Sequence, residues 1–346
     1  MTGHRGHFGI WLAHAFPAMS CNSCRVSVVI PLFNSVGTLR RAIESVSRQS
    51  LHDIELLIVD DASEDASLAL ARGLAAADSR ISVIALRRNQ GKSHAMNVAI
   101  ERARGHWIAV LDADDWYEPD RLAVLVGAGE AHGAQLVADN QFFHDAAADC
   151  VVRTAFDPEQ SDKRLTKRTF VEQSDPYAEF NYGMLKPVVR SNFLREHSLV
   201  YRENARLSED FLYLIEFFAA SGTGLLISRP LYNWTEPFGS LSRQWTTTGA
   251  GSWRYDFQSA LLANEEVRDQ LRLRNEVLLA SLLDARAQAF RRLHHISEIN
   301  RLRAEKSGAA KILATIVCHP SIWPQLAQRL LRSARRRITV PPTSLR

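Results

Sequence analysis

The chain has 346 residues, enough for one large domain or two ordinary ones. Apolar residues make up 46% and charged residues 23%, as is usual for a globular protein, and no apolar run reaches the roughly 18 residues of a transmembrane helix. The net charge is +4, but from Arg301 onward ten Lys or Arg accompany one acid, Glu305, so the remainder is net acidic. An anionic partner should therefore be sought at the C-terminal tail.

The first 24 residues contain apolar pieces broken by His14 and Pro17, and we expect residues 1–24 to be a disordered leader, with Met19 as the true start. Cys21 and Cys24 form one C-x-x-C pair with no second pair at zinc-binding spacing. Unremarkable thiols of this kind are typical of a reduced, cytoplasmic protein.

Apolar strands and amphipathic helices alternate from residue 26 to residue 111. We expect strands at 26–30, 54–59, 81–86 and 106–111, and helices at 36–46, 66–77 and 92–102. Strict strand–helix alternation predicts an α/β fold with a parallel sheet and right-handed crossovers.

Acidic residues follow two of these strands. Asp60 and Asp61 end the second strand, and Asp112, Asp114 and Asp115 follow the fourth. Ligands of open α/β sheets bind at the carboxyl ends of strands, and carboxylates this close together favour a hard cation such as Mg²⁺ or Mn²⁺. The alternative is ordinary turn and helix-capping chemistry in a polar loop.

Other nucleotide and metal motifs are excluded. No G-x-G-x-x-G follows the first strand, and a P-loop ending at Gly91-Lys92-Ser93 would need glycine where Leu86 stands. An EF-hand loop would need glycine where Tyr117 stands.

Beyond Arg121 the alternation weakens, and a buried helix stands out. The run 211–218 is apolar nearly all round and is preceded by Ser208, Glu209 and Asp210. These residues are either caps of the helix or rigidly held carboxylates, one of which could act as a general base. The segment 230–243 mixes aromatics, hydroxyls and Arg243, which predicts a long binding loop or lid.

The C-terminal hundred residues are expected to be helical. The segment 253–307, rich in Arg and Glu, predicts a solvated helical hairpin, and 322–337 predicts a basic amphipathic helix. Such a helix can bind an anionic membrane surface or pack on the domain with its arginines in solvent. Nucleic acid is not an expected partner, because no recognised binding motif accompanies the charge.

Taken together, these motifs resemble family 2 glycosyltransferases of the GT-A fold. The resemblance is carried by 28–34, 59–65, 89–91 with Asn97, 111–115, 208–210 and 239–242. It covers residues 26–245, and around 182–190 the chain resembles bacterial exopolysaccharide enzymes of the succinoglycan type. It departs from the usual pattern at Ala62, where Gly or Asn is common, and at Phe33, where Tyr is commoner.

We expect the chain to have three parts. Residues 1–24 precede a GT-A domain at 25–245, with a nucleotide-sugar-binding half at 25–125 and an acceptor half at 126–245. Residues 246–346 form a helical C-terminal extension with the basic tail.

The implied activity is an inverting, metal-dependent transfer of a hexose from a nucleotide-diphosphate sugar, most often a uridine one. The implied acceptor is a glycan or a polyprenyl-linked saccharide in bacterial surface polysaccharide synthesis. This would occur in the cytoplasm, or peripherally at the inner face of the cell membrane if the tail binds lipid.

The resemblance also assigns roles to residues. Asp210, assisted by Glu209, is the implied base, and Asp112 and Asp114 are the implied ligands of Mg²⁺ or Mn²⁺. The implied donor-binding residues are Pro31, Phe33, Asn34, Asp60, Asp61, Asn89, Gly91, Lys92, Asp112, Ala113 and Arg243.

Two alternatives come from other classes. A degenerate GT-A domain could serve as a nonenzymatic scaffold of a polysaccharide assembly complex, although acids are retained at all three sites. A nucleotidyltransferase would need a loop rich in glycine and arginine after the first strand, and 31–35 offers none.

Overall fold

The computed structural model of the chain describes residues 24–176, 178, 180–205, 207–236, 257–304, 309–318 and 323. The expected leader, apart from Cys24, and the expected tail helix 322–337, apart from Trp323, lie outside these residues.

Strands and helices alternate through the first half, as expected. The strands are β1 (Val26–Leu32), β2 (Ile54–Asp60), β3 (Ile81–Ala85), β4 (Trp107–Val110), β5 (Trp116–Tyr117), β6 (Leu136–Asp145), β7 (Cys150–Thr154), β8 (Lys163–Leu165), β9 (Val188–Arg190) and β10 (Gly224–Glu236). The helices are α1 (Leu39–Ser47), α2 (Ser67–Ala77), α3 (Lys92–Arg102), α4 (Arg121–Ala131), α5 (Lys167–Glu172), α6 (Ser191–Glu196), α7 (Glu209–Ala219), α9 (Phe257–Leu273), α10 (Val277–Ala304) and α11 (Ala309–Cys318), with a 3₁₀ turn, η1, at Tyr182–Met184.

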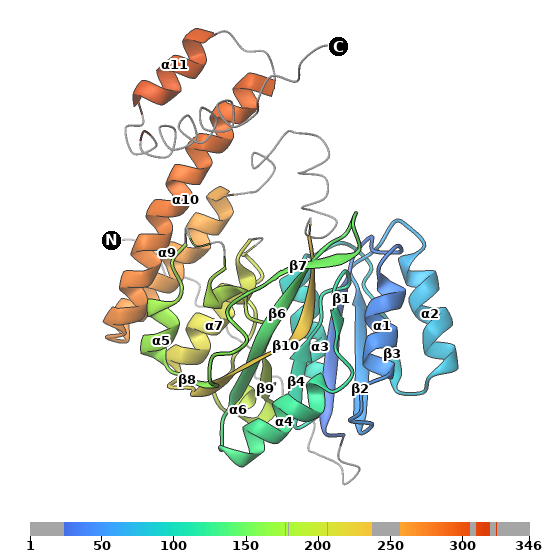
Figure 1. Cartoon of the computed structure of the whole chain (residues 1–346). Coiled ribbons are helices and arrows are strands. Elements are labelled where there is room, and N and C mark those ends of the chain that lie inside the picture. The colour runs from blue at the N-terminus through green and yellow to red at the C-terminus, as the bar shows by residue number, and fades with distance from the viewer. Residues whose placement is uncertain are drawn as a thin grey trace, which may run out of the picture.

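Within the described residues these strands form one sheet, whose main path runs β3-β2-β1-β4-β9-β6-β10-β5 (Figure 1). β3, β2, β1 and β4 are parallel. β9 is antiparallel to β4 and to β6, whereas β10 is parallel to β6. The predicted α/β class is confirmed, and the parallel half continues into a mixed half.

Alternating side chains of the strands build a hydrophobic core on each face of the sheet. In β1, Val28 and Ile30 enter one core with α1 and α4, while Val29 enters the other with α3 and α7. This is the period-2 pattern of a strand covered on both faces. Because both faces are covered by helices, the carboxyl edge of the parallel strands is where polar loops gather.

The helices α9 and α10 are less exposed to solvent than the sequence suggested. The hairpin of α9 and α10 is present, but Val267, Leu271, Leu279 and Leu283 are buried in the same core as α3 and α7. Helical periodicity places these four residues on inward faces, which a charge-rich composition hides.

Three local predictions need correction. Residues 230–236 belong to β10 and not to a loop, because register shifts around Pro230 let the strand continue past the proline. Val36 is exposed and precedes α1. A proline suits the first turn of a helix, and Pro119 was expected to stand there, but it precedes α4. The strands β5, β7 and β8 were not predicted, and α11 lies between the two helical segments expected in the C-terminal extension.

Among the described residues, no helix is both long and apolar enough to cross a membrane.

Candidate active site

The loops after β1 and β2 are tied together by side-chain hydrogen bonds. Asn34 has a left-handed φ of 48°, and its Oδ1 accepts hydrogen bonds from the N–H groups of Glu64 at 2.8 Å and Asp65 at 3.4 Å. The N–H of Asn34 donates to Ser63 Oγ at 3.0 Å. Together with Pro31 in β1 and the partly buried Phe33, these loops form a rim at the carboxyl ends of β1 and β2.

Asp61 organises the loop that leads into α3. Its two carboxylate oxygens accept the N–H groups of Gln90 and Gly91, each at 2.7 Å, and Asn89 donates to its carbonyl at 3.2 Å. Gly91 has a φ of 94°, a conformation that favours glycine. Asp61 therefore fixes the start of α3, which carries Lys92.

Asp60 is buried beside Asp61. Its Oδ2 accepts from the Ser63 N–H at 3.2 Å, and its Oδ1 has no hydrogen-bond partner in the described part of the chain. Of the two acids at the end of β2, Asp60 is the one with a carboxylate oxygen that accepts no hydrogen bond within the described residues.

The loop after β4 lies against β10. The buried Asp115 accepts from the Tyr232 hydroxyl at 2.7 Å and from the Thr235 N–H at 2.9 Å. Burial, with the charges of Asp114 and Asp112, raises the pKa of Asp115 well above its usual value. The Ala113 carbonyl accepts from Thr38 at 2.9 Å. These contacts fix the loop and make Asp115 a structural acid.

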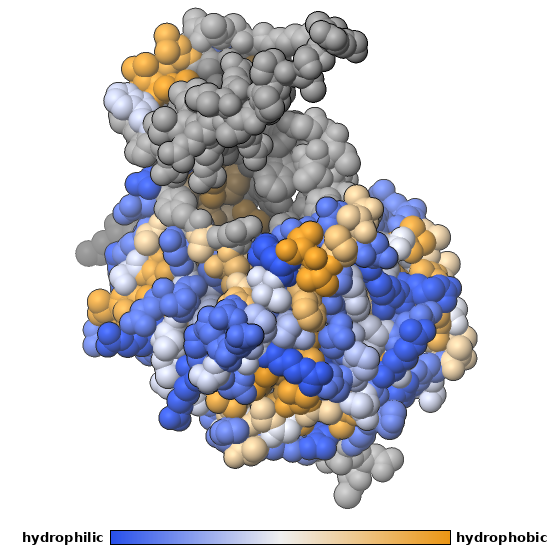
Figure 2. Space-filling model, in the orientation of Figure 1, coloured by the Kyte–Doolittle hydropathy of each residue, from blue (hydrophilic) through white to orange (hydrophobic). Residues whose placement is uncertain are grey.

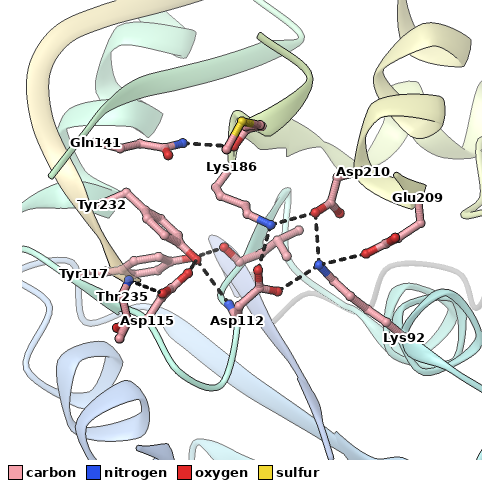
Figure 3. Close-up of polar contacts among 12 residues, drawn as sticks. Lys92, Asp112, Asp115, Tyr117, Gln141, Lys186, Glu209, Asp210, Tyr232 and Thr235 are labelled. Atoms are coloured by element: carbon pink, nitrogen blue, oxygen red, sulfur yellow. Dashed lines mark hydrogen bonds and ion pairs between the residues drawn. The ribbon is translucent and has the colours of Figure 1, made fainter. Parts of the chain in front are cut away.

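Two lysines join the acids after β4 to those of α7 (Figure 3). Lys186 Nζ lies 2.7 Å from Asp112 Oδ2 and 2.6 Å from Asp210 Oδ2. Lys92 Nζ lies 3.0 Å from Asp112 Oδ1, 3.0 Å from Asp210 Oδ2 and 3.3 Å from Glu209 Oε1. Residues distant in sequence thus form one charged cluster at the carboxyl edge of the sheet.

The lysines keep these carboxylates ionised. Burial alone would raise the pKa of Asp112 and of Asp210, but the charges of Lys186 and Lys92 outweigh it, and both pKa values lie below the usual range. Asp210 Oδ2 is shared by the two lysines, whereas its buried Oδ1 has no hydrogen-bond partner among the described residues. Ser208, which precedes the pair, is the N-cap residue of α7 but makes no side-chain capping bond.

The pKa of Asp114 is shifted in the opposite direction from that of Asp112. Burial and the negative charge of Asp112 raise the pKa of Asp114, so the pair is repulsive and a divalent cation would relieve it. Among the described residues no group of three or more His, Cys, Asp or Glu is arranged to hold a metal. Two carboxylates fit a Mg²⁺ or Mn²⁺ ion whose other ligands are water and substrate phosphates.

A buried ion pair between Arg121 and Asp139 contacts the main chain of Lys186. Arg121 and Asp139 are fully buried, and Arg121 Nη2 and Nε lie 2.7 Å and 2.9 Å from the two carboxylate oxygens. Arg121 also donates to the Lys186 carbonyl and stands over the rings of Tyr117 and Tyr232. The main chain of Lys186 is thereby fixed.

The structure brings together Lys92, Asp112, Glu209 and Asp210, and places Asp114 in the loop of Asp112. Arg243 lies outside the described residues. Lys186 and Arg121 are not among the predicted site residues. The available signal for Lys186 was one lysine in the otherwise uncharged stretch 182–189, because an ammonium buried there needs a carboxylate partner.

Comparison with known proteins identifies relatives for much of the chain. Residues 27–182 match the family described as "Glycosyl transferase family 2". The succinoglycan biosynthesis protein ExoO of Rhizobium meliloti is 35% identical over 221 residues, covering 63% of this chain and 62% of ExoO. ExoU of the same organism is 33% identical over 190 residues, covering 54% of each chain. The chain thus spans less than two thirds of the length of these relatives.

A solved structure is similar in fold. TarS 1–349 of S. aureus in complex with UDP-GlcNAc is 17% identical, with a TM-score of 0.57, covering 81% of this chain and 73% of that one. The predicted GT-A fold is confirmed.

Proposed function

Residues 27–182 belong to glycosyl transferase family 2, and on that premise we propose that this protein is an inverting glycosyltransferase that uses a nucleotide-diphosphate sugar. The observation that carries the proposal is that Lys186 bridges two carboxylates. One is Asp112, at the carboxyl edge of the sheet, and the other is Asp210, at the start of α7. A cluster of this kind places the diphosphate-binding charges beside a carboxylate that can accept a proton.

The donor is a uridine sugar in this proposal. The rim formed by Pro31, Phe33 and Asn34 and the acids Asp60 and Asp61 would bind the nucleoside, because carboxylates can accept hydrogen bonds from a base N–H or a ribose diol. Asp60 Oδ1, buried without a partner among the described residues, supports this role. The UDP-GlcNAc in the TarS complex is consistent with a uridine donor for this fold.

Asp112 and Asp114 would hold Mg²⁺ or Mn²⁺ together with the donor diphosphate. The bound cation would stabilise the negative charge that develops on the leaving diphosphate. Lys92, whose side chain is 28% exposed, can turn from its carboxylates to the phosphates, and Arg243 would add a second cationic group.

Asp210 acts as the base. Its Oδ2 is held by Lys186 and Lys92, so Oδ1 is the oxygen that receives the proton of the acceptor hydroxyl. The acceptor oxygen forms a bond to the anomeric carbon from the face opposite the diphosphate, and the bond between that carbon and the diphosphate oxygen breaks. One displacement inverts the configuration at this carbon.

The acceptor is a growing glycan or a polyprenyl-linked saccharide at the inner membrane face. The similarity to ExoO and ExoU supports a role in exopolysaccharide synthesis. α11 exposes apolar side chains, including Leu313 and Val317, at the far end of α10, and Figure 2 shows this apolar surface. Apolar side chains that are followed in the sequence by a basic segment fit an anionic lipid surface.

The metal-assisted donor site is tested by calorimetric titration of UDP with and without Mn²⁺. Wild-type protein should bind UDP in the presence of Mn²⁺ and lose binding after chelation. D114A should lose the Mn²⁺-dependent part while remaining folded, whereas D53A, an exposed acid at the opposite end of β2, should bind as wild type. Unchanged binding by D114A would remove the metal assignment.

Membrane contact is tested separately by sedimentation with vesicles of anionic or neutral lipid. The full chain should pellet with anionic vesicles, and a chain ending at Pro320 or the L313E variant should pellet less. Equal pelleting of all three would show that neither segment binds lipid.

A further inference from the structure

The C-terminal helix pair contacts the N-terminus of α7, immediately before the proposed base. Arg286 of α10 is buried, and its Nη2 donates a hydrogen bond to Ser208 Oγ at 2.8 Å. Its Cζ lies 3.7 Å from the ring centroid of Phe211, the third residue of α7. A single side chain of α10 thus contacts residues on both sides of Glu209 and Asp210.

The electrostatic setting of Arg286 is unusual for an arginine. In the described part of the chain it forms no ion pair, and its buried Nε has no hydrogen-bond partner. Burying a guanidinium without a carboxylate is costly, since arginine stays protonated. Its retained contacts are the Ser208 hydroxyl and the faces of Phe211 and Phe290. If the side chain served only to fill this space, a methionine or leucine would do so with a smaller desolvation cost than an arginine.

The backbone conformation of Ser208 is unfavourable, so a hydrogen bond that holds this residue in place contributes to the start of α7. Ser208 has a φ of 67°, a left-handed conformation that is unfavourable for a residue with a Cβ. The preceding Leu207 packs against Phe257 of α9 and Phe290 of α10. The chain is therefore held on α9 and α10 up to the residue at which α7 begins.

The other end of α7 is also attached to this helix pair. Glu216 accepts hydrogen bonds from Arg202 at 2.7 Å and from Arg274, between α9 and α10, at 2.9 Å. Arg202 forms an ion pair with Glu266 of α9 as well. α7 is thus fastened near both ends to helices that lie outside the segment matched to the family.

We propose that Arg286 is a positioning residue for the reaction: acting through Ser208, it sets the direction in which α7 presents Asp210 to the acceptor. The inference rests on the proposed function for its kinetic consequence. It also makes α9 and α10 part of the catalytic unit rather than an appended extension.

The variants follow from these contacts. R286M keeps the aliphatic stem and loses the hydrogen bond, whereas S208A removes the hydroxyl and keeps the Cβ that defines the backbone strain. R291M is the matched control, because Arg291 lies further along α10, is half exposed and pairs with Glu265 of α9. The full chain is used throughout, with the double variant R286M/S208A.

The expected kinetic result is a loss in kcat without a loss in donor affinity. R286M and S208A should each lower kcat by about three- to tenfold, less than the full effect of losing one charged hydrogen bond, because Arg286 acts on Asp210 only through Ser208. The double variant should fall no further than R286M. Affinity for UDP with Mn²⁺ should stay within about twofold, because the Ser208 hydroxyl bonds to Arg286 and, within the described residues, to no donor-binding side chain. R291M should match the wild type.

Amide hydrogen exchange of residues 209–213 tests the same inference without turnover. Exchange there should rise in R286M and S208A and stay unchanged in R291M. If R286M does not fold, S208A decides. Wild-type kcat and wild-type exchange in the folded variants would overturn the inference, whereas a wild type with no turnover on any donor would overturn the proposed function and leave the exchange result interpretable.

Discussion

Replacing Lys186 by methionine removes the ammonium that joins Asp112 to Asp210, the proposed base, and keeps most of the side-chain volume. Lys186 Nζ lies 2.7 Å from Asp112 and 2.6 Å from Asp210, and its side chain is 4% exposed. In K186M these two carboxylates would face each other with Lys92 as their remaining cation. K186M should therefore stabilise the negative charge of the donor diphosphate less well, and it should hold the Asp210 carboxylate less firmly in its orientation.

The magnitude follows from the burial of the group. Removing one partner of a buried, hydrogen-bonded charge pair costs about 2–5 kcal/mol, and each 1.36 kcal/mol is about tenfold in rate. Because Lys92 remains and the two carboxylates are about one-fifth exposed, we expect the lower part of that range. K186M should therefore lose about 30- to 300-fold in kcat/KM.

The assay is release of nucleoside diphosphate from the donor at several donor concentrations. K163M is the control, since Lys163 is an exposed lysine of β8 remote from the cluster. Denaturant unfolding of each variant separates a folding defect from a catalytic one. A folded K186M with kcat/KM within threefold of the wild type would refute the bridging role.

Two further variants test other parts of the structure. D210N keeps the size of the side chain and removes its basicity, so kcat should fall by about a hundredfold or more while UDP binding is nearly normal; an unchanged transfer rate would reduce Asp210 to a structural residue. D139N leaves the Arg121 guanidinium buried without its charged partner and should lower the free energy of unfolding by about 3–5 kcal/mol, measured by denaturant titration. In the double variant R121M/D139L, which has no charge to bury, most of that loss should be recovered, and a double variant as unstable as D139N would contradict this account.

The parallel half of the fold could be predicted because its signals are local. In β1 and β2, β-branched and leucine runs are followed within a few residues by polar side chains, so both the strands and their polar ends are visible in the sequence. The acids Asp61 and Asp112 were located in this way. The structure adds that Asp61 uses both oxygens to hold the loop before α3, which is the turn chemistry that the sequence left open as an alternative.

The rest of the site depends on long-range pairing that local patterns do not encode. Lys186 reaches Asp112 because β9 pairs antiparallel with β4, and nothing near residue 186 indicates that neighbour. Pro230 suggested a loop, but the bulge in β10 accommodates it and brings Tyr232 to Asp115. Arg286 lies in a segment whose charged composition suggested a solvated hairpin, although its own side chain is buried.

The most direct test of the central claim is to incubate the purified full chain with a panel of nucleotide sugars and Mn²⁺ and to measure nucleoside diphosphate release. Wild type should release the diphosphate from at least one donor, and D210N should bind that donor with nearly unchanged affinity and release much less. No binding and no release with any donor would contradict the claim and favour a nonenzymatic scaffold, and release of pyrophosphate would indicate a nucleotidyltransferase.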